Sequence, residues 1–145
     1  MNGRSGGSKE WLWAASIALV CHTAWYGADA LQGGFRNLDV GGIAYNARLL
    51  LAGDLPYVDS WEFKPPGAFF LFAPLLAFGS MHTVWVTAIL WGTATSLSVG
   101  LLAGRLWGRR YALPAVALHA GGTLLPTQAD INYVFWATLP YVLAA

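Results

Sequence analysis

The sequence predicts an all-helical integral membrane protein, a polytopic helix bundle whose first loop, on the extracytoplasmic side, contains juxtamembrane helices. Two observations lead to this prediction: hydrophobic residues make up 57% of the 145 residues, and charged residues make up only 10%. A soluble domain carries about 25% charged residues, so this chain lacks the polar surface that a water-exposed globule needs. The net charge of +1 argues against a nucleic-acid partner, which would need a concentrated basic surface.

Three apolar stretches are long enough to cross a membrane, since a spanning helix needs about 20 apolar residues. After a polar tail (residues 1–10) they cover residues 11–30, 82–104 and 111–128. A fourth run, 131–145, is still apolar where the chain stops, and we therefore expect 11–145 to be the amino-terminal part of a longer membrane domain. Ala28-Asp29-Ala30 resembles a signal-peptidase site, but the run before it is longer than the usual apolar core of about 7–15 residues, which favours a retained helix.

Cations beside the spans predict their orientation. Arg4 and Lys9 precede the first span, and Arg105, Arg109 and Arg110 separate the second from the third. The positive-inside rule places both groups in the cytoplasm, so the loop 31–81 lies on the extracytoplasmic face. We expect a multi-pass protein of a bacterial-type plasma (inner) membrane with a cytoplasmic amino terminus.

The outer loop begins with a short amphipathic helix. Asp39 precedes it, Gly53 ends it, and Asn46 and Arg48 are predicted to turn away from its apolar face. That face is predicted to consist of Ile43, Ala47, Leu50 and Leu51. Asp39 is either the helix N-cap or a carboxylate held at the membrane surface as a catalytic base or ligand, and both roles can hold together.

The later part of the loop combines a cation with a stiff turn. Lys64 precedes Pro65-Pro66, which biases its backbone toward an extended conformation. A lysine at headgroup depth suits a phosphate contact, although snorkelling toward the headgroups is the simpler interpretation. The apolar run 65–79 is shorter than a span, so we expect a helix that lies on, or dips into, the outer leaflet.

Three further polar residues lie in or beside the spans. His22 falls in the first span, where it is either a functional group or a neutral histidine hydrogen-bonded to a neighbouring helix. His119 lies beside two glycines on a predicted helix-packing surface. Asp130 lies at the outer end of the third span and brings a second carboxylate to the face that holds Asp39. Two carboxylates there would suit activation of a hydroxyl or binding of a cation.

The ordered motifs of the outer loop support a resemblance to a known family. They are Asp39, Tyr45-Asn46-Ala47-Arg48, Gly53-Asp54-Leu55-Pro56-Tyr57, Asp59-Ser60-Trp61, Lys64-Pro65-Pro66-Gly67 and Phe78-Gly79. This order resembles membrane glycosyltransferases of the GT-C fold, in the branch of the protein O-mannosyltransferases and the lipid A aminoarabinose transferases. That family has an acidic residue at the start of the loop, a Lys-Pro-Pro turn and a second outer acidic residue, which Asp130 matches. The family often has Asp-Glu where this chain has Asp39-Val40, and its members are several times longer.

The resemblance implies a partial GT-C fold and a glycosyltransferase. The enzyme would move a sugar from a polyprenyl-phosphate donor to a hydroxyl of a protein or of an envelope glycan or lipid, outside the cytoplasm. Asp39 would be the catalytic base, and Lys64 with Arg36 would neutralise the leaving phosphate. The sugar or acceptor pocket would be formed by Asp130, Asp59, Glu62 and Tyr45. No cofactor is required; a divalent metal shared by Asp39 and Asp130 stays an open alternative.

Two other classes remain open at this point. A small polytopic membrane protein or transporter subunit would use His22, His119 and Asp130 and would tolerate changes in the outer loop. A non-catalytic remnant would insert into the membrane without any activity. Because three complete spans and part of a fourth do not enclose a cavity, we expect this chain alone to be inactive.

Overall fold

Every regular element in the described part of the chain is helical. The computed structural model describes residues 5–32, 38–61, 66–124 and 133–145. Within these ranges lie six α-helices, one 3-10 helix and no strand, which confirms the predicted all-helical class. The elements are α1 (Ser5–Gln32), α2 (Leu38–Ala52), α3 (Gly67–Ala77), α4 (Met81–Trp107), η1 (Arg109–Tyr111), α5 (Ala112–Gly122) and α6 (Tyr133–Ala144).

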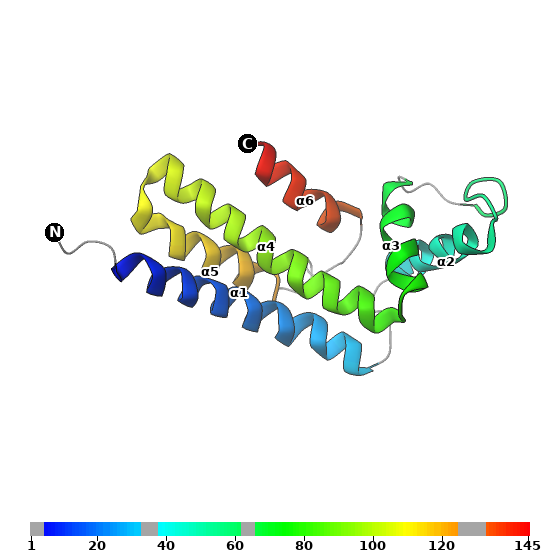
Figure 1. The fold of residues 1–145 in the computed structure, drawn as a ribbon, viewed down its shortest axis with the longest axis horizontal. Coiled ribbons are helices and arrows are strands. Elements are labelled where there is room, and N and C mark those ends of the chain that lie inside the picture. The colour runs from blue at the N-terminus through cyan, green and yellow to red at the C-terminus, as the bar shows by residue number, and fades with distance from the viewer. Residues whose placement is uncertain (1–4, 33–37, 62–65, 125–132) are drawn as a thin grey trace.

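Helices α1, α4 and α5 lie side by side as a three-helix bundle (Figure 1). The chain runs along α1, returns along α4 and reverses again into α5. The 28 residues of α1 and the 27 residues of α4 give lengths of about 40 Å at about 1.5 Å per residue. Small buried residues let the helices approach closely, a pattern common between membrane helices. Ala14 and Ala18 of α1 pack against Val116 and Ala120 of α5.

Two of the predicted spans fall inside long helices. Helix α1 contains residues 11–30, and α4 contains residues 82–104. Among the described residues, α4 is the one helix that is both long and apolar enough to cross a membrane by length and composition. The predicted third span, 111–128, starts with the end of η1 and with α5, and its last four residues lie outside the described ranges. Helix α6 covers most of the fourth apolar run.

Helices α2 and α3 pack together at one end of the bundle (Figure 1). They pack against each other, and α3 also contacts α4 and α6. Phe69 and Phe72 of α3 are fully buried and join Ile43 of α2, Val84 of α4 and Tyr26 of α1 in one hydrophobic core. The apolar run 65–79 therefore contains a helix of 11 residues that packs across the end of the bundle.

Local sequence explains where α2 ends. Gly53 adopts φ 91, a conformation that favours glycine, and its N–H donates to Leu50 O at 3.2 Å. The N–H of Asp54 donates to Leu49 O at 2.9 Å, which completes the hydrogen-bond pattern of a Schellman motif. At its other end α2 begins at Leu38, so Asp39 lies in the first turn of the helix instead of preceding it.

The predicted apolar face of α2 is wrong for two residues, Asn46 and Leu51. Asn46, expected to turn away, is 2% exposed, and Leu51, expected on the apolar face, is 49% exposed. The buried face is centred on Val40, Ile43 and Ala47. At about 100° per residue Leu51 lies within about 50° of the centre of this face and Asn46 about 90° away from it, so helical periodicity explains neither exception. Leu51 is in the last turn of α2, and Asn46 bonds Ser60 of the following loop. Arg48 is exposed, as predicted.

Candidate functional site

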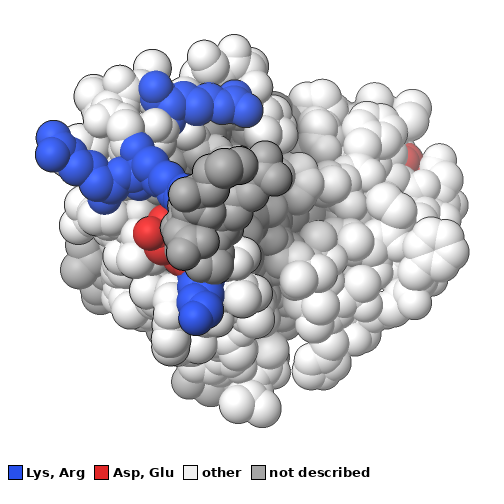
Figure 2. Space-filling view, turned by 60° about the vertical axis from the view of Figure 1, so that its left-hand side comes forward, with Lys and Arg blue, Asp and Glu red and all other residues white. Residues whose placement is uncertain are grey.

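The two ends of the bundle differ in their chemistry. At one end the start of α1 meets the turn between α4 and α5, where Glu10 pairs with Arg109 at 3.0 Å. Lys and Arg side chains gather at this end, and most of the remaining face in that view is uncharged (Figure 2). At the opposite end lie α2 and α3 (Figure 1). The helix that bears Asp39 is thus at the end away from the basic turn.

Asp39 lies in the first turn of α2 and is partly exposed. The N-terminal turn of a helix carries a partial positive charge, so an acidic side chain suits this position. Its neighbour Val40 is buried in the core between α2 and α3, which fixes the backbone that holds the carboxylate. The position combines a rigid backbone with access from outside, as a general base for an incoming hydroxyl requires.

A buried amide joins α2 to the loop that follows it. Asn46 donates from Nδ2 to Gly42 O at 3.0 Å, and its Oδ1 accepts a hydrogen bond from Ser60 Oγ. Asn46 is seven residues after Asp39, almost two full helical turns, so the two side chains share one face of α2. The structure thus places Asp39, Asn46 and Ser60 along one side of this helix. The sequence prediction assigned no role to Asn46 or Ser60, although both occur in the quoted motifs.

Two other predicted pocket residues are placed differently. Asp59 is exposed and accepts a hydrogen bond from the backbone N–H of Leu55 at 2.8 Å, so its carboxylate closes a turn within its own loop. Tyr45 is 56% exposed and lies six residues after Asp39, about a third of a turn away from the Asp39 face. Asp59 is thus bonded within its own loop, and Tyr45 lies on a different side of α2 from Asp39. Four predicted site residues lie outside the described ranges: Arg36, Glu62, Lys64 and Asp130.

Three polar side chains, one each from α1, α4 and α5, contact one another inside the bundle. The Oγ of Ser96 on α4 lies 3.0 Å from Nε2 of His22 on α1 and 2.9 Å from Nδ1 of His119 on α5. Ser96 Oγ also lies 3.0 Å from Gly92 O, and the donor in each contact with an imidazole depends on the tautomer of that ring. His22 is fully buried. Of the two predicted interpretations of His22, the hydrogen bond to a neighbouring helix is present, and the sequence prediction missed its partner Ser96.

Metal ligands do not gather in the described part of the chain. Among those residues no group of three or more His, Cys, Asp and Glu side chains could hold a metal ion. Asp130 lies outside those residues, so the proposed sharing of a cation with Asp39 stays a prediction. Comparison of the chain with models of known protein families, with curated proteins and with solved structures finds no match.

Proposed function

We propose that the chain belongs to a membrane glycosyltransferase that takes its sugar from a polyprenyl-phosphate donor on the extracytoplasmic side. The observation that carries the proposal is the joint position of α2 and α3. The helix that holds Asp39 packs against a short apolar helix, and both lie at the end of the bundle away from the cationic α4–α5 turn. A catalytic carboxylate beside an apolar surface is the arrangement that a lipid-linked substrate requires. The resemblance in the loop motifs adds the reaction class.

The surface of the bundle supports a membrane location for this site. Between Glu10 and Asp29 on α1, and between His82 and Arg105 on α4, the sequence contains no Asp, Glu, Lys or Arg. Large apolar side chains on these helices and on α5 are exposed, as they would be against lipid. They are Leu12, Trp13, Leu19, Val20, Val86, Leu90, Leu101 and Leu118. So extensive an apolar exterior is typical of a surface that meets lipid or another protein.

The proposed reaction uses Asp39 as the general base. Asp39 takes the proton of the acceptor hydroxyl while the hydroxyl oxygen attacks the anomeric carbon of the sugar. The bond from that carbon to the phosphate oxygen breaks, polyprenyl phosphate leaves with the electron pair, and the configuration at the carbon inverts. Arg36 and Lys64 would neutralise the phosphate as its charge grows. The exposed aromatic rings of Phe70 and Phe78, on and just after α3, would border the polyprenyl tail.

The proposal is tested by Asp39→Asn in the protein as its gene encodes it, with transfer of radiolabelled sugar from a polyprenyl-phosphate donor as the measurement. Loss of a general base lowers the rate by about 100-fold to 10,000-fold. Asp54→Asn is the matched control, because Asp54 is exposed in the turn after α2 and loses the same charge. If Asp39→Asn and Asp54→Asn both keep the wild-type rate, the assignment of the base is wrong.

The proposed orientation has its own test. In a Cys21→Ala background, single cysteines replace Lys9 and Asp54, both of which are exposed. A membrane-impermeant maleimide added to intact cells should label the Asp54→Cys variant. It should label the Lys9→Cys variant only after the membrane is opened. Labelling of both variants in intact cells would contradict the placement of the two ends on opposite sides of a membrane.

One observation favours a second candidate, a transporter subunit. The polar group formed by His22, Ser96 and His119 lies inside the bundle, and ionisable residues within membrane helices often mark transport pathways. A transporter would lose its function when His22 is replaced by Phe and would keep it in Asp39→Asn. The glycosyltransferase proposal expects the loss of activity in Asp39→Asn.

A further inference from the structure

We propose that the basic end of the bundle binds the headgroup of an anionic phospholipid. This end contains the start of α1, the end of α4 and the turn into α5. Lys9, Arg105, Arg109 and Arg110 are all exposed there, and Glu10 is the one acidic side chain among the described residues of this end (Figure 2). The excess of cations provides charge complementarity to an anion.

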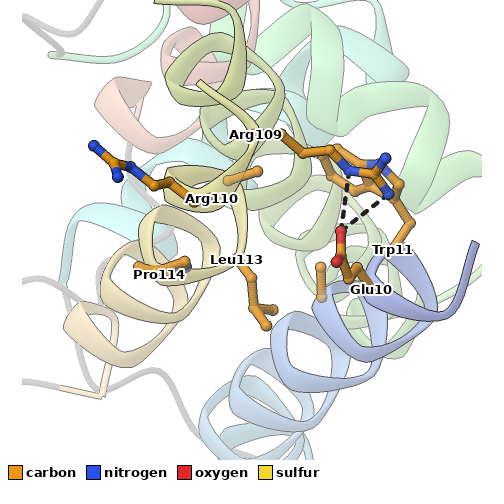
Figure 3. A pocket seen from close by; sticks show the side chains of 8 residues that line it. Glu10, Trp11, Arg109, Arg110, Leu113 and Pro114 are labelled. Atoms are coloured by element: carbon orange, nitrogen blue, oxygen red, sulfur yellow. Dashed lines mark hydrogen bonds and ion pairs between the residues drawn. The ribbon is translucent and has the colours of Figure 1, made fainter. Parts of the chain in front are cut away.

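A pocket of about 470 Å³ opens between the start of α1 and the turn into α5 (Figure 3). Its rim is charged, with Glu10, Arg109 and Arg110, whereas apolar side chains line the rest, including Trp11, Ala14 and Leu113. A phospholipid presents a phosphate next to apolar chains and matches both parts of this lining. A free phosphate ion would use only the charged rim, and the apolar lining therefore favours a lipid.

The two arginines at the rim are in different electrostatic situations. Arg109 is held by Glu10, with Nη2 at 3.0 Å and Nε at 3.1 Å from Oε2, so a carboxylate already occupies its guanidinium. Arg110 points away from this pair in Figure 3 and donates to the neutral phenol oxygen of Tyr111 at 3.0 Å. Its guanidinium carbon lies 4.8 Å from the centre of the Tyr111 ring, which orients the side chain without neutralising it. Of the two arginines at the rim, Arg110 is therefore the one whose described contacts are with a phenol instead of a carboxylate, and it is the better candidate to meet a phosphate.

The surroundings of the pocket match the boundary of a bilayer. Trp107 is 68% exposed and Tyr111 is 42% exposed beside the basic residues. Tryptophan and tyrosine concentrate at the headgroup level of membrane proteins, and basic pockets between helices on the cytoplasmic side bind anionic lipid headgroups. On the proposed orientation, the pocket opens at the cytoplasmic leaflet, which carries anionic lipid.

The test is native mass spectrometry of the protein in a neutral detergent, with phosphatidylglycerol or phosphatidylcholine of identical acyl chains added. We expect phosphatidylglycerol to bind at least fivefold more tightly. Arg110→Gln should weaken its binding about fivefold, the factor that corresponds to about 1 kcal/mol for one cation near an anionic surface. Glu10→Gln should tighten binding by a similar factor, because it releases Arg109. Arg48→Gln is the control, since Arg48 is also exposed but lies on α2 at the opposite end.

Several results would overturn the proposal. Equal binding of the two lipids would exclude a headgroup site for anions, as would an Arg110→Gln variant that behaves like Arg48→Gln. Weaker binding in Glu10→Gln would contradict the role given to the Glu10–Arg109 pair. Displacement of phosphatidylglycerol by millimolar inorganic phosphate would show a site for a soluble anion instead of a lipid. The sugar-transfer assay on Asp39→Asn is independent of each of these results.

Discussion

Gly100 lies at a tight contact between α4 and α5 where a single methyl group should be costly. In Gly100→Ala the new Cβ would come within 3.0 Å of Cγ2 of Val116 and to 3.1 Å from the backbone oxygen of Ala112. Carbon atoms pack best at about 3.5–4.0 Å, so the methyl group overlaps Val116 by more than about 0.5 Å. Val116 is fully buried and the oxygen of Ala112 is part of the backbone, so the two helices must separate.

Two opposing effects set the change in folding stability caused by Gly100→Ala. Overpacking of a close contact destabilises by about 1–3 kcal/mol, and the better helix propensity of alanine returns up to about 1 kcal/mol. From the middle of the overpacking range, about 2 kcal/mol, the net loss is about 1–2 kcal/mol. That loss lowers the melting temperature of a chain of this size by about 3–8 °C. Thermal unfolding of the purified protein in detergent, followed by circular dichroism, measures this shift.

Two variants make the result decisive. Gly121→Ala on α5 is the matched control, because a Cβ at Gly121 would meet no atom within 4 Å, and we expect no loss of melting temperature. In a Val116→Ala background the added methyl group has more room, so Gly100→Ala should cost less there than in the wild type. Equal melting temperatures for Gly100→Ala and Gly121→Ala, or an unchanged cost in the Val116→Ala background, would refute the contact between α4 and α5.

Two further predictions concern the polar contacts. Ser96→Ala leaves two imidazoles without their hydrogen-bond partner and should cost about 1–3 kcal/mol, whereas Ser98→Ala, which loses only a bond to its own helix, should melt like the wild type. Equal melting of the two variants would contradict the contacts among His22, Ser96 and His119. Asn46→Ala removes the acceptor of the Ser60 hydroxyl, so limited proteolysis of residues 53–61 should become faster. Arg48→Ala on the exposed side of the same helix should be cleaved at the wild-type rate, and identical cleavage of both variants would show that this hydrogen bond does not hold the loop.

The positions of the two long helices could be predicted from local sequence, although α1 begins at Ser5, inside the predicted polar tail. The apolar runs 11–30 and 82–104 lack charged residues apart from Asp29, and the observed α1 and α4 include them. The end of α2 was also predictable, because Gly53 supplies the backbone conformation that terminates a helix. These features depend on residues close to each other in the chain.

The polar contacts could not be predicted in the same way, because their partners are distant in the sequence. Ser96 is 74 residues from His22 and 23 residues from His119, and only the packing of three helices brings them together. The burial of Asn46 depends on which side of α2 faces α3, which the periodicity of α2 alone left ambiguous. Arg36, Lys64 and Asp130 lie outside the described residues, so their proposed roles stay predictions of the sequence.

The helix lengths connect the proposed site to the chemistry of a lipid-linked donor. A bilayer has a hydrocarbon core of about 30 Å and a total thickness of about 40–45 Å with its headgroups. Helices α1 and α4, at about 40 Å each, have the length that the proposed crossing from one headgroup layer to the other requires. With the basic end at the cytoplasmic headgroups, α2 and Asp39 fall near the outer headgroup layer. The phosphate of a polyprenyl-phosphate sugar lies at that same depth, so the donor could meet Asp39 while its tail stays in the hydrocarbon beside α3.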